Sequence, residues 1–220
     1  MRTIFLTAAL SALLASVPVS AAPRLTGHYR LAGGPDVAGE LEIGADYRFR
    51  YALAAGALDE QAAGRWVQQG AKVCLFTEPR PVPPVFTLAP RPAPNKNAPT
   101  EEAATLLVKW PNGRGVALVD FRIGFDSGEP LDGYTQDYGW TMPQDDSRVP
   151  RWIELAVPMH GLKSPRLALD GHERGTINVV LTPNDLGIVD FQGACLEAQG
   201  TGYVLHHRDL GDMRFVRRVR

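Results

Sequence analysis

Five consecutive residues, Tyr47-Arg48-Phe49-Arg50-Tyr51, alternate between aromatic and cationic side chains. In a β-strand, successive side chains point to opposite faces, so this order places three rings on one face and two guanidinium groups on the other. A shift of one residue in register would bury both arginines. The segment therefore predicts a half-buried strand whose aromatic face covers a core.

Short alternating segments of this kind, separated by turn residues, continue along the chain. Of the 220 residues, 22 are glycine and 18 are proline, which favours turns and disfavours long helices. A content of 45% hydrophobic and 21% charged residues excludes a fully disordered chain. We predict an all-β fold, in which an antiparallel barrel or sandwich is built from N- and C-terminal strands and a second β-sandwich-like module lies between them.

The strand and proline patterns divide the chain into five parts. We expect a signal peptide over residues 1–21, a β-meander over 22–78, a proline-rich linker over 79–103, a β-sandwich-like module over 104–182 and C-terminal strands over 183–220. A meander alone leaves two open sheet edges, and barrel closure removes them. We therefore expect the C-terminal strands to pair with the meander and not with the module.

The N-terminal residues have the pattern of a secretory signal peptide. Arg2 supplies the positive charge, an apolar run follows from Ile4 to Leu14, and small residues precede a cleavage position after Ala21. The run is shorter than the roughly 20 apolar residues that span a bilayer. A retained N-terminal anchor is the alternative interpretation. We expect a periplasmic or secreted protein without a transmembrane segment, and the net charge of -1 does not indicate a nucleic-acid partner.

Only two cysteines are present, Cys74 and Cys195, and both lie in apolar strand segments. In an exported protein this favours a disulfide between them, with two separately buried free cysteines as the alternative. Residues 79–99 contain eight prolines, which exclude a helix or a central strand. An extended linker is favoured over a proline-rich recognition segment, and Val85–Leu88 within it could dock on a sheet edge.

Two partial family resemblances accompany these patterns. The first covers Glu40–Ile43, the turn to Tyr47–Phe49, Gly64-x-Trp66 and Val73–Leu75, and it resembles the opening of a small lipocalin-like antiparallel barrel. The second covers Leu106–Val108, Pro111–Gly113, Val119–Phe121, Gly133 and Thr135–Gly139, and it is similar to carboxypeptidase-regulatory or transthyretin-like β-sandwich modules. Neither resemblance implies a catalytic residue.

The aromatic residues of the meander form the first candidate site. Strict alternation places Leu41 and Ile43 on the same side as these rings, while Arg48 and Arg50 face outward. An eight-stranded barrel has room for side chains or for one small ligand. The rings are therefore either a filled core or the lining of an apolar ligand site, and the candidate residues are Tyr47, Phe49, Tyr51 and Trp66.

The acidic segment 126–146 forms the second candidate site, because it has six carboxylates and no Lys or Arg. A solvated loop, a Ca²⁺ site and the carboxylate pair of an envelope hydrolase are the three interpretations. A hydrolase would bring two or more carboxylates together beside Tyr134 or Trp140. The candidate residues of this loop site are Asp126, Asp132, Tyr134, Asp137 and Trp140, and Asp145 or Asp146 could supply a further carboxylate.

No nucleophile, metalloprotease, phosphate-loop or dinucleotide motif is present. His206-His207 with Asp209, and His172-Glu173, would each need a further ligand to hold a metal, so we predict no metal, no cofactor and no catalytic residue. The resulting hypothesis is an exported, non-catalytic cell-envelope β-protein that acts as a binding or structural module. Its candidate partners are a small apolar ligand or an envelope protein, and an envelope hydrolase is the alternative.

Overall fold

The computed structural model describes residues 25–90, 103–170, 175–200, 202–207 and 211–218. This part of the chain is built from β-strands, with a single-turn 3-10 helix at Pro158–His160. No helix among the described residues is long and apolar enough to cross a membrane. The expected signal peptide, residues 1–21, lies outside the described residues. The predicted all-β class is confirmed.

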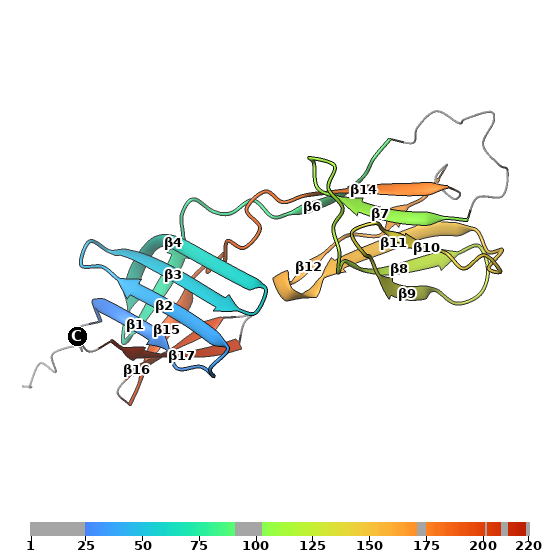
Figure 1. Ribbon diagram of the computed structural model, residues 1–220. Helices are drawn as coiled ribbons and strands as arrows, with labels where there is room; N and C mark the ends of the chain where they lie inside the picture. The colour runs from blue at the N-terminus through green and yellow to red at the C-terminus, as the bar shows by residue number, and fades with distance from the viewer. Residues whose placement is uncertain (1–24, 91–102, 171–174, 201, 208–210, 219–220) are drawn as a thin grey trace, which may run out of the picture.

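Eight antiparallel strands close into a barrel in the order β1-β17-β16-β15-β5-β4-β3-β2 (Figure 1). Closure is made by β17 on β1, where Tyr29 lies opposite Arg217, and by β15 on β5. The predicted pairing of the C-terminal strands with the N-terminal meander is confirmed. This architecture is consistent with the lipocalin-like resemblance. The strands are β1 (Gly27–Leu31), β2 (Val37–Ile43), β3 (Arg48–Ala55), β4 (Leu58–Gln69), β5 (Lys72–Thr77), β15 (Ala194–Gln199), β16 (Gly202–His207) and β17 (Gly211–Arg217).

A disulfide joins β5 to β15 on the outer face of the barrel wall. Cys74 and Cys195 lie directly opposite each other in the ladder and are bonded, as predicted. Their neighbours Leu75 and Leu196 point the other way, into the core. The bridge spans 121 positions of sequence. It therefore links the N-terminal and C-terminal strands of the barrel covalently, although the whole middle of the chain separates them in sequence.

Aromatic rings fill the barrel interior. The Phe191 ring lies 5.8 Å from that of Phe49 and 5.0 Å from that of Tyr51, between ring centroids. The Tyr51 ring in turn lies 6.5 Å from the Phe215 ring, between centroids. Phe49 and Phe215 are 1% and 0% exposed, and edge-on contacts of this kind add to the stability that burial gives.

Two further sheets are built from the middle of the chain. One has the order β10-β7-β14-β6, with β14 parallel to β7, and the other has the order β12-β11-β8-β9, with β13 beside β11. Their inner faces share one hydrophobic core, so we call the pair the sandwich. Its strands are β6 (Val85–Leu88), β7 (Thr105–Lys109), β8 (Asp120–Phe125), β9 (Leu131–Tyr134), β10 (Trp140–Thr141), β11 (Pro150–Val157), β12 (Leu162–Lys163), β13 (Leu167–Ala168) and β14 (Thr176–Thr182).

The proline-rich segment is more than a linker. Strand β6 lies inside the range expected to be a linker, and it pairs with β14 at the edge of its sheet, with Val85 opposite Thr182. Docking of Val85–Leu88 on a sheet edge is thereby confirmed. Proline is compatible with this position because an edge strand leaves one side of its ladder unpaired.

Two segments, residues 79–84 and 183–190, run between barrel and sandwich, and we call them the double connector (Figure 1). Residues 184–187 of the second segment form a turn. The Val82 amide donates to the Asp185 carboxylate at 2.8 Å. Beyond this contact the returning segment docks on β4. The Gln61 amide donates to the Gly187 carbonyl, and the Val189 amide donates to the Gln61 carbonyl, both at 2.9 Å. The double connector is therefore fixed against the barrel wall.

Candidate functional site

Three of the four predicted interior aromatics lie where the alternation puts them. Phe49, Tyr51 and Trp66 are 1%, 3% and 8% exposed, and Arg48 and Arg50 face outward. All three belong to the core cluster of the barrel. Burial and ring contact favour a filled core over an empty ligand chamber.

The position predicted for Tyr47 is wrong, because this side chain is 64% exposed. Tyr47 has a φ of 63° and precedes β3, which begins at Arg48. It is therefore a turn residue, and the alternation of the strand does not reach it. Its ring lies 4.9 Å from that of Trp66, and the Trp66 indole donates to the Gly44 carbonyl at 2.9 Å. Together these contacts hold the turn before β3 against Trp66 of β4.

An inward-facing carboxyl, Glu60, escaped the sequence analysis. It lies on the same face of β4 as the buried Ala62 and Trp66, and the Tyr51 hydroxyl makes a long hydrogen bond of 3.5 Å to it. Burial raises the pKa of Glu60. Burial and the nearby Glu60 charge also raise the pKa of Tyr51. The period-two alternation of β4 was the signal that could have found Glu60.

A groove of about 670 Å³ lies on the outer wall of the barrel, over β1 to β4 and against the double connector. The ladder register explains its shape. One row across the strands reads His28, Glu42, Arg50 and Ala63. The next row reads Arg30, Glu40, Ala52 and Gln61, and Gln61 pairs with Ile188 of the connector. Small side chains, Ala52 and Ala63, therefore form the floor where the connector stands above the sheet.

The walls of this groove are mostly apolar on one side and ion-paired on the other. Pro79, Pro81 and Ile188 of the double connector line it. At the opposite side, Arg218 lies 3.2 Å from Glu40, and Arg50 lies 4.0 Å from Glu42. A second hollow of about 570 Å³ shares Glu40, Ala52 and Gln61 with the first and continues toward Gly187. We call the two hollows together the barrel groove.

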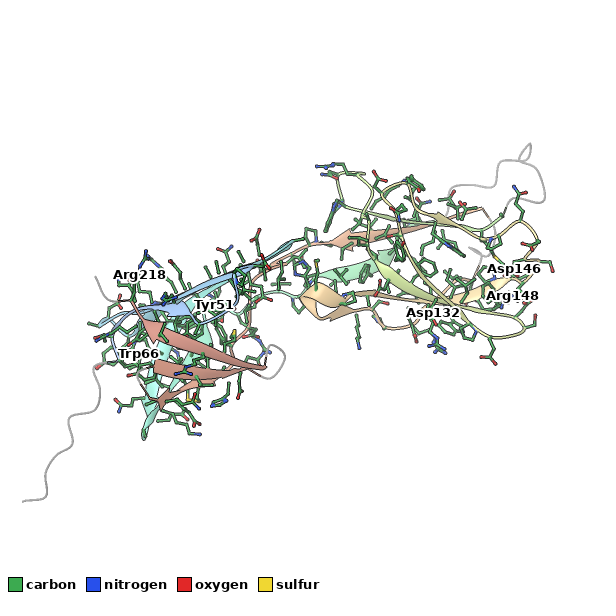
Figure 2. The ribbon with its side chains drawn as sticks, turned by 60° about the horizontal axis from the view of Figure 1, so that its bottom comes forward. Tyr51, Trp66, Asp132, Asp146, Arg148 and Arg218 are labelled. Atoms are coloured by element: carbon green, nitrogen blue, oxygen red, sulfur yellow. A yellow bond between two sulfur atoms is a disulfide. The ribbon has the colours of Figure 1, made fainter. Side chains whose placement is uncertain are left out.

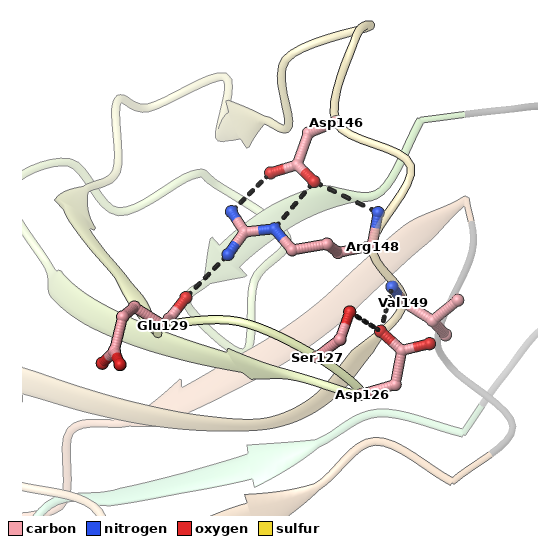
Figure 3. Close-up of polar contacts among 6 residues, drawn as sticks. All are labelled: Asp126, Ser127, Glu129, Asp146, Arg148 and Val149. Carbon is pink, nitrogen blue, oxygen red and sulfur yellow. Dashed lines mark hydrogen bonds and ion pairs between the residues drawn. The ribbon is translucent and has the colours of Figure 1, made fainter.

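The acidic segment is held by hydrogen bonds to its own neighbours (Figure 3). The Arg148 guanidinium donates to both Asp146 oxygens at 2.9 and 2.6 Å and to the Glu129 carbonyl at 2.7 Å. The Arg148 side chain holds the pKa of Asp146 below its usual range. Arg148 lies just beyond the acidic segment, which is why the count of charges within 126–146 missed it.

Asp126 has a comparable structural role in the same loop. Its carboxylate accepts the Val149 amide at 3.1 Å and the Ser127 hydroxyl at 3.4 Å. The hydrogen bond from the Val149 backbone lowers the pKa of Asp126. The carboxylates of Asp146 and Asp126 thus accept hydrogen bonds from residues of their own loop, which is typical of a structural role.

The carboxylates do not converge on the predicted aromatic residues. Figure 2 shows Asp146 and Arg148 at the end of the sandwich that is far from the barrel, and Asp132 nearer the middle of the sandwich. Asp132 faces Arg122 at 3.8 Å on β8. Tyr134 and Trp140 line a separate hollow of about 440 Å³, and none of the described residues that line it is acidic. Asp132 shares the exposed face of β9 with Tyr134, and Asp137 lies in the turn closed by Gln136 and Gly139, but none of Asp126, Asp132 and Asp137 lines this hollow.

The histidine clusters would each need a further ligand to hold a metal. His206 lies 2.8 Å from Asp212 and 3.8 Å from Glu197, on the exposed barrel wall. Asp209, His172 and Glu173 lie outside the described residues. Within the described ranges, no three His, Cys, Asp or Glu side chains are grouped so that they could hold a metal ion.

No protein-family model matches the chain, and no curated protein or solved structure matches it either.

Proposed function

We propose that the protein is an exported binding module of the cell envelope, and that its ligand lies in the barrel groove and not inside the barrel. The observation that carries this proposal is the contrast between the two faces of one wall. The inner face packs aromatic rings, whereas the outer face has a hollow of about 670 Å³ over alanines. Small-molecule sites have volumes of roughly 300 to 1,000 Å³.

The ligand class follows from the lining. Ala52 and Ala63 allow an apolar body to lie close to the sheet, and Ile188 covers it from the connector. At the rim, Glu42 and Glu40 are paired with Arg50 and Arg218, and Asp185 accepts the Val82 amide, so a charged head group would have to displace these contacts. The exposed Gln61 side-chain amide offers N–H donors and a carbonyl acceptor on the floor. We therefore expect a small, neutral and largely apolar molecule with one polar group.

Export is supported by the signal-like residues 1–21 and by the Cys74–Cys195 disulfide, since such bridges persist in oxidising compartments. The lipocalin-like pattern of residues 27–76 is in keeping with a small-ligand module, although the proposed site is on the other side of the wall. The transthyretin-like pattern of residues 106–140 suggests a non-catalytic sandwich. An envelope hydrolase has less support, because Asp126, Asp132 and Asp146 are held by Val149, Arg122 and Arg148, and none of the described residues that line the hollow at Tyr134 and Trp140 is acidic.

Filling the groove tests the proposal. The dye Nile red, which is neutral and largely apolar, should bind the wild-type protein in a saturable manner with a shift of its emission to shorter wavelength. Ala52→Leu and Ala63→Leu should each weaken binding about tenfold or more, because the added side chain occupies the floor. Ala117→Leu, at an exposed position outside the groove, is the matched control. Equal dye binding by all four proteins would refute the site.

A further inference from the structure

Aromatic side chains gather on the surface of the sandwich, in the segment between β9 and β10. Tyr134 and Tyr138 are 55% and 79% exposed, and Trp140 is half-buried. With Gln136 and Thr141 they line a hollow of about 440 Å³, which we call the aromatic hollow. Isolated exposed rings are common on protein surfaces, but a cluster of rings around a hollow usually marks an interaction site.

The backbone that presents these rings is fixed. Thr135 is fully buried, and its hydroxyl donates to the Val116 carbonyl at 2.8 Å and accepts the Val119 amide at 3.3 Å. The turn that follows is closed by two hydrogen bonds between Gln136 and Gly139. Gly115 packs against the turn so closely that a Cβ atom there would lie 1.6 Å from the Asp137 carbonyl oxygen. The backbone that carries the exposed rings is therefore held in place before any ligand arrives.

The floor of the hollow is continuous with the sandwich core. The Trp140 ring lies 4.8 Å from the buried Phe121 ring, between centroids, so one part of the indole is supported by the core while the rest lines the hollow. The Gly139 position has a φ of 97°, and a Cβ atom there would lie 2.5 Å from the Leu106 carbonyl oxygen. Glycine at this position allows the chain to turn sharply and bring Trp140 against the sheet.

The chemistry of the lining selects a ligand class. None of the described lining residues carries a carboxylate, ammonium, guanidinium or imidazole group, so the lining itself offers a charged ligand no counter-charge. The charges next to Tyr134, Asp120 opposite it in the ladder and Asp132 on the same face of β9, disfavour an anionic ligand in particular. A purely apolar ligand would cover the Gln136 amide and the Thr141 hydroxyl, which shares a hydrogen bond with the Thr105 hydroxyl, without offering either group a polar partner. A pyranose ring meets both demands, because its C–H face is apolar and its rim carries hydroxyl groups.

We propose that the aromatic hollow binds a neutral glycan. Sugar rings lie against the Tyr138 and Trp140 faces, and their hydroxyl groups hydrogen-bond to Gln136 and Thr141. Aromatic residues suit this role because they give a large, rigid contact area at a small cost in conformational entropy. The site is independent of the barrel groove, so either proposal can fail without the other.

Calorimetric titration of the full-length mature protein with three neutral hexasaccharides, cellohexaose, chitohexaose and maltohexaose, tests this inference. At least one should bind and change the tryptophan fluorescence, and the acidic hexamer of galacturonic acid should bind more weakly. The hexasaccharide that binds identifies the sugar and the linkage that the site recognises. Failure of all three neutral hexasaccharides, or tighter binding of the acidic one, would overturn the proposal.

Variants at Tyr138 test whether the sugar stacks on this aromatic ring. Tyr138→Ala should weaken binding of that hexasaccharide about tenfold, whereas Tyr138→Phe, which keeps the ring, should stay within about threefold of the wild type. Tyr47→Ala removes another exposed tyrosine, from the barrel end, and should change nothing. Folding of each variant is checked by its circular dichroism and melting temperature. Unchanged affinity in a folded Tyr138→Ala protein would refute the assignment.

Discussion

The Thr77 hydroxyl donates a hydrogen bond of 2.7 Å to the Val189 carbonyl, and it also accepts the Phe191 amide at 3.1 Å. Thr77 ends β5, and its partners belong to the chain that returns from the sandwich. One buried side chain thus holds both the segment that walls the barrel groove and the segment that carries Phe191 into the core.

Thr77→Val should therefore destabilise the protein although it keeps the shape of the side chain. The Val189 carbonyl and the Phe191 amide would each lose a buried partner, which costs about 1–3 kcal/mol in the free energy of unfolding. Urea denaturation gives this number directly. Thr87→Val, on the exposed face of β6, is the control and should change stability by less than about 0.5 kcal/mol.

Phe49→Ala tests whether the barrel interior is a packed core. The Phe49 ring is 1% exposed and contacts Phe191, so its removal should cost about 3–5 kcal/mol of unfolding free energy. Denaturant titration of the variant, with Tyr47→Ala as the exposed aromatic comparison, measures the difference. A loss below about 1 kcal/mol at Phe49 would mean that the ring borders empty space, and would return the ligand site to the interior.

Glu60→Gln should stabilise the protein increasingly as the pH rises. Burial raises the pKa of Glu60 above its ordinary value of 4.5, so the folded state holds this proton more tightly than the unfolded state. The stability gained from protonated Glu60 is full below pH 4.5 and is lost as the pH rises through the raised pKa. The variant does not ionise at this position and avoids that loss.

The measurement is the difference in unfolding free energy between Glu60→Gln and the wild type from pH 4 upward. It should grow with pH and then level off above the raised pKa. Asp59→Asn removes an exposed carboxylate from the adjacent position and separates the effect of burial from that of net charge. A difference that stays constant with pH would show that Glu60 is not desolvated in the folded protein.

Replacing both cysteines by serine should lower the stability of the oxidised protein. The bridge closes a loop of 121 positions, which corresponds to about 4–5 kcal/mol in the chain-entropy model. Comparison of the melting temperatures of the wild type, the wild type with reductant, and the double variant measures this contribution. If reductant leaves the wild-type melting temperature unchanged while free thiols appear, the bridge does not constrain the unfolded chain as described.

The alternation of apolar and polar residues along a strand predicted those features that depend only on residues adjacent in sequence. The pattern from Arg48 to Tyr51 sets which side chains face the core, because the period of a strand fixes its two faces. The same argument failed at Tyr47, whose positive φ places it in a turn. The bridge between Cys74 and Cys195 was predictable because the sequence holds only two thiols and both lie in strand segments.

The barrel groove could not be predicted in this way, because it depends on pairings between distant segments. Ala52 and Ala63 become a floor only when the ladder register places them in adjacent rows, and Ile188 becomes a wall only when Gln61 pairs with it. The contacts that hold the acidic loop could not be predicted for a related reason, since the partner of Asp146 is Arg148, which lies just outside the acidic segment.

The most direct test of the barrel groove is an amide chemical-shift map of the isotope-labelled mature protein, titrated with 1-octanol as a neutral apolar probe with one polar group. We predict saturable shifts centred on Ala52, Gln61, Ala63 and Ile188, which line the groove from the wall and from the connector. Shifts centred instead on Phe49 and Phe215 in the barrel interior, or an absence of saturable shifts on the barrel wall, would contradict the proposed site.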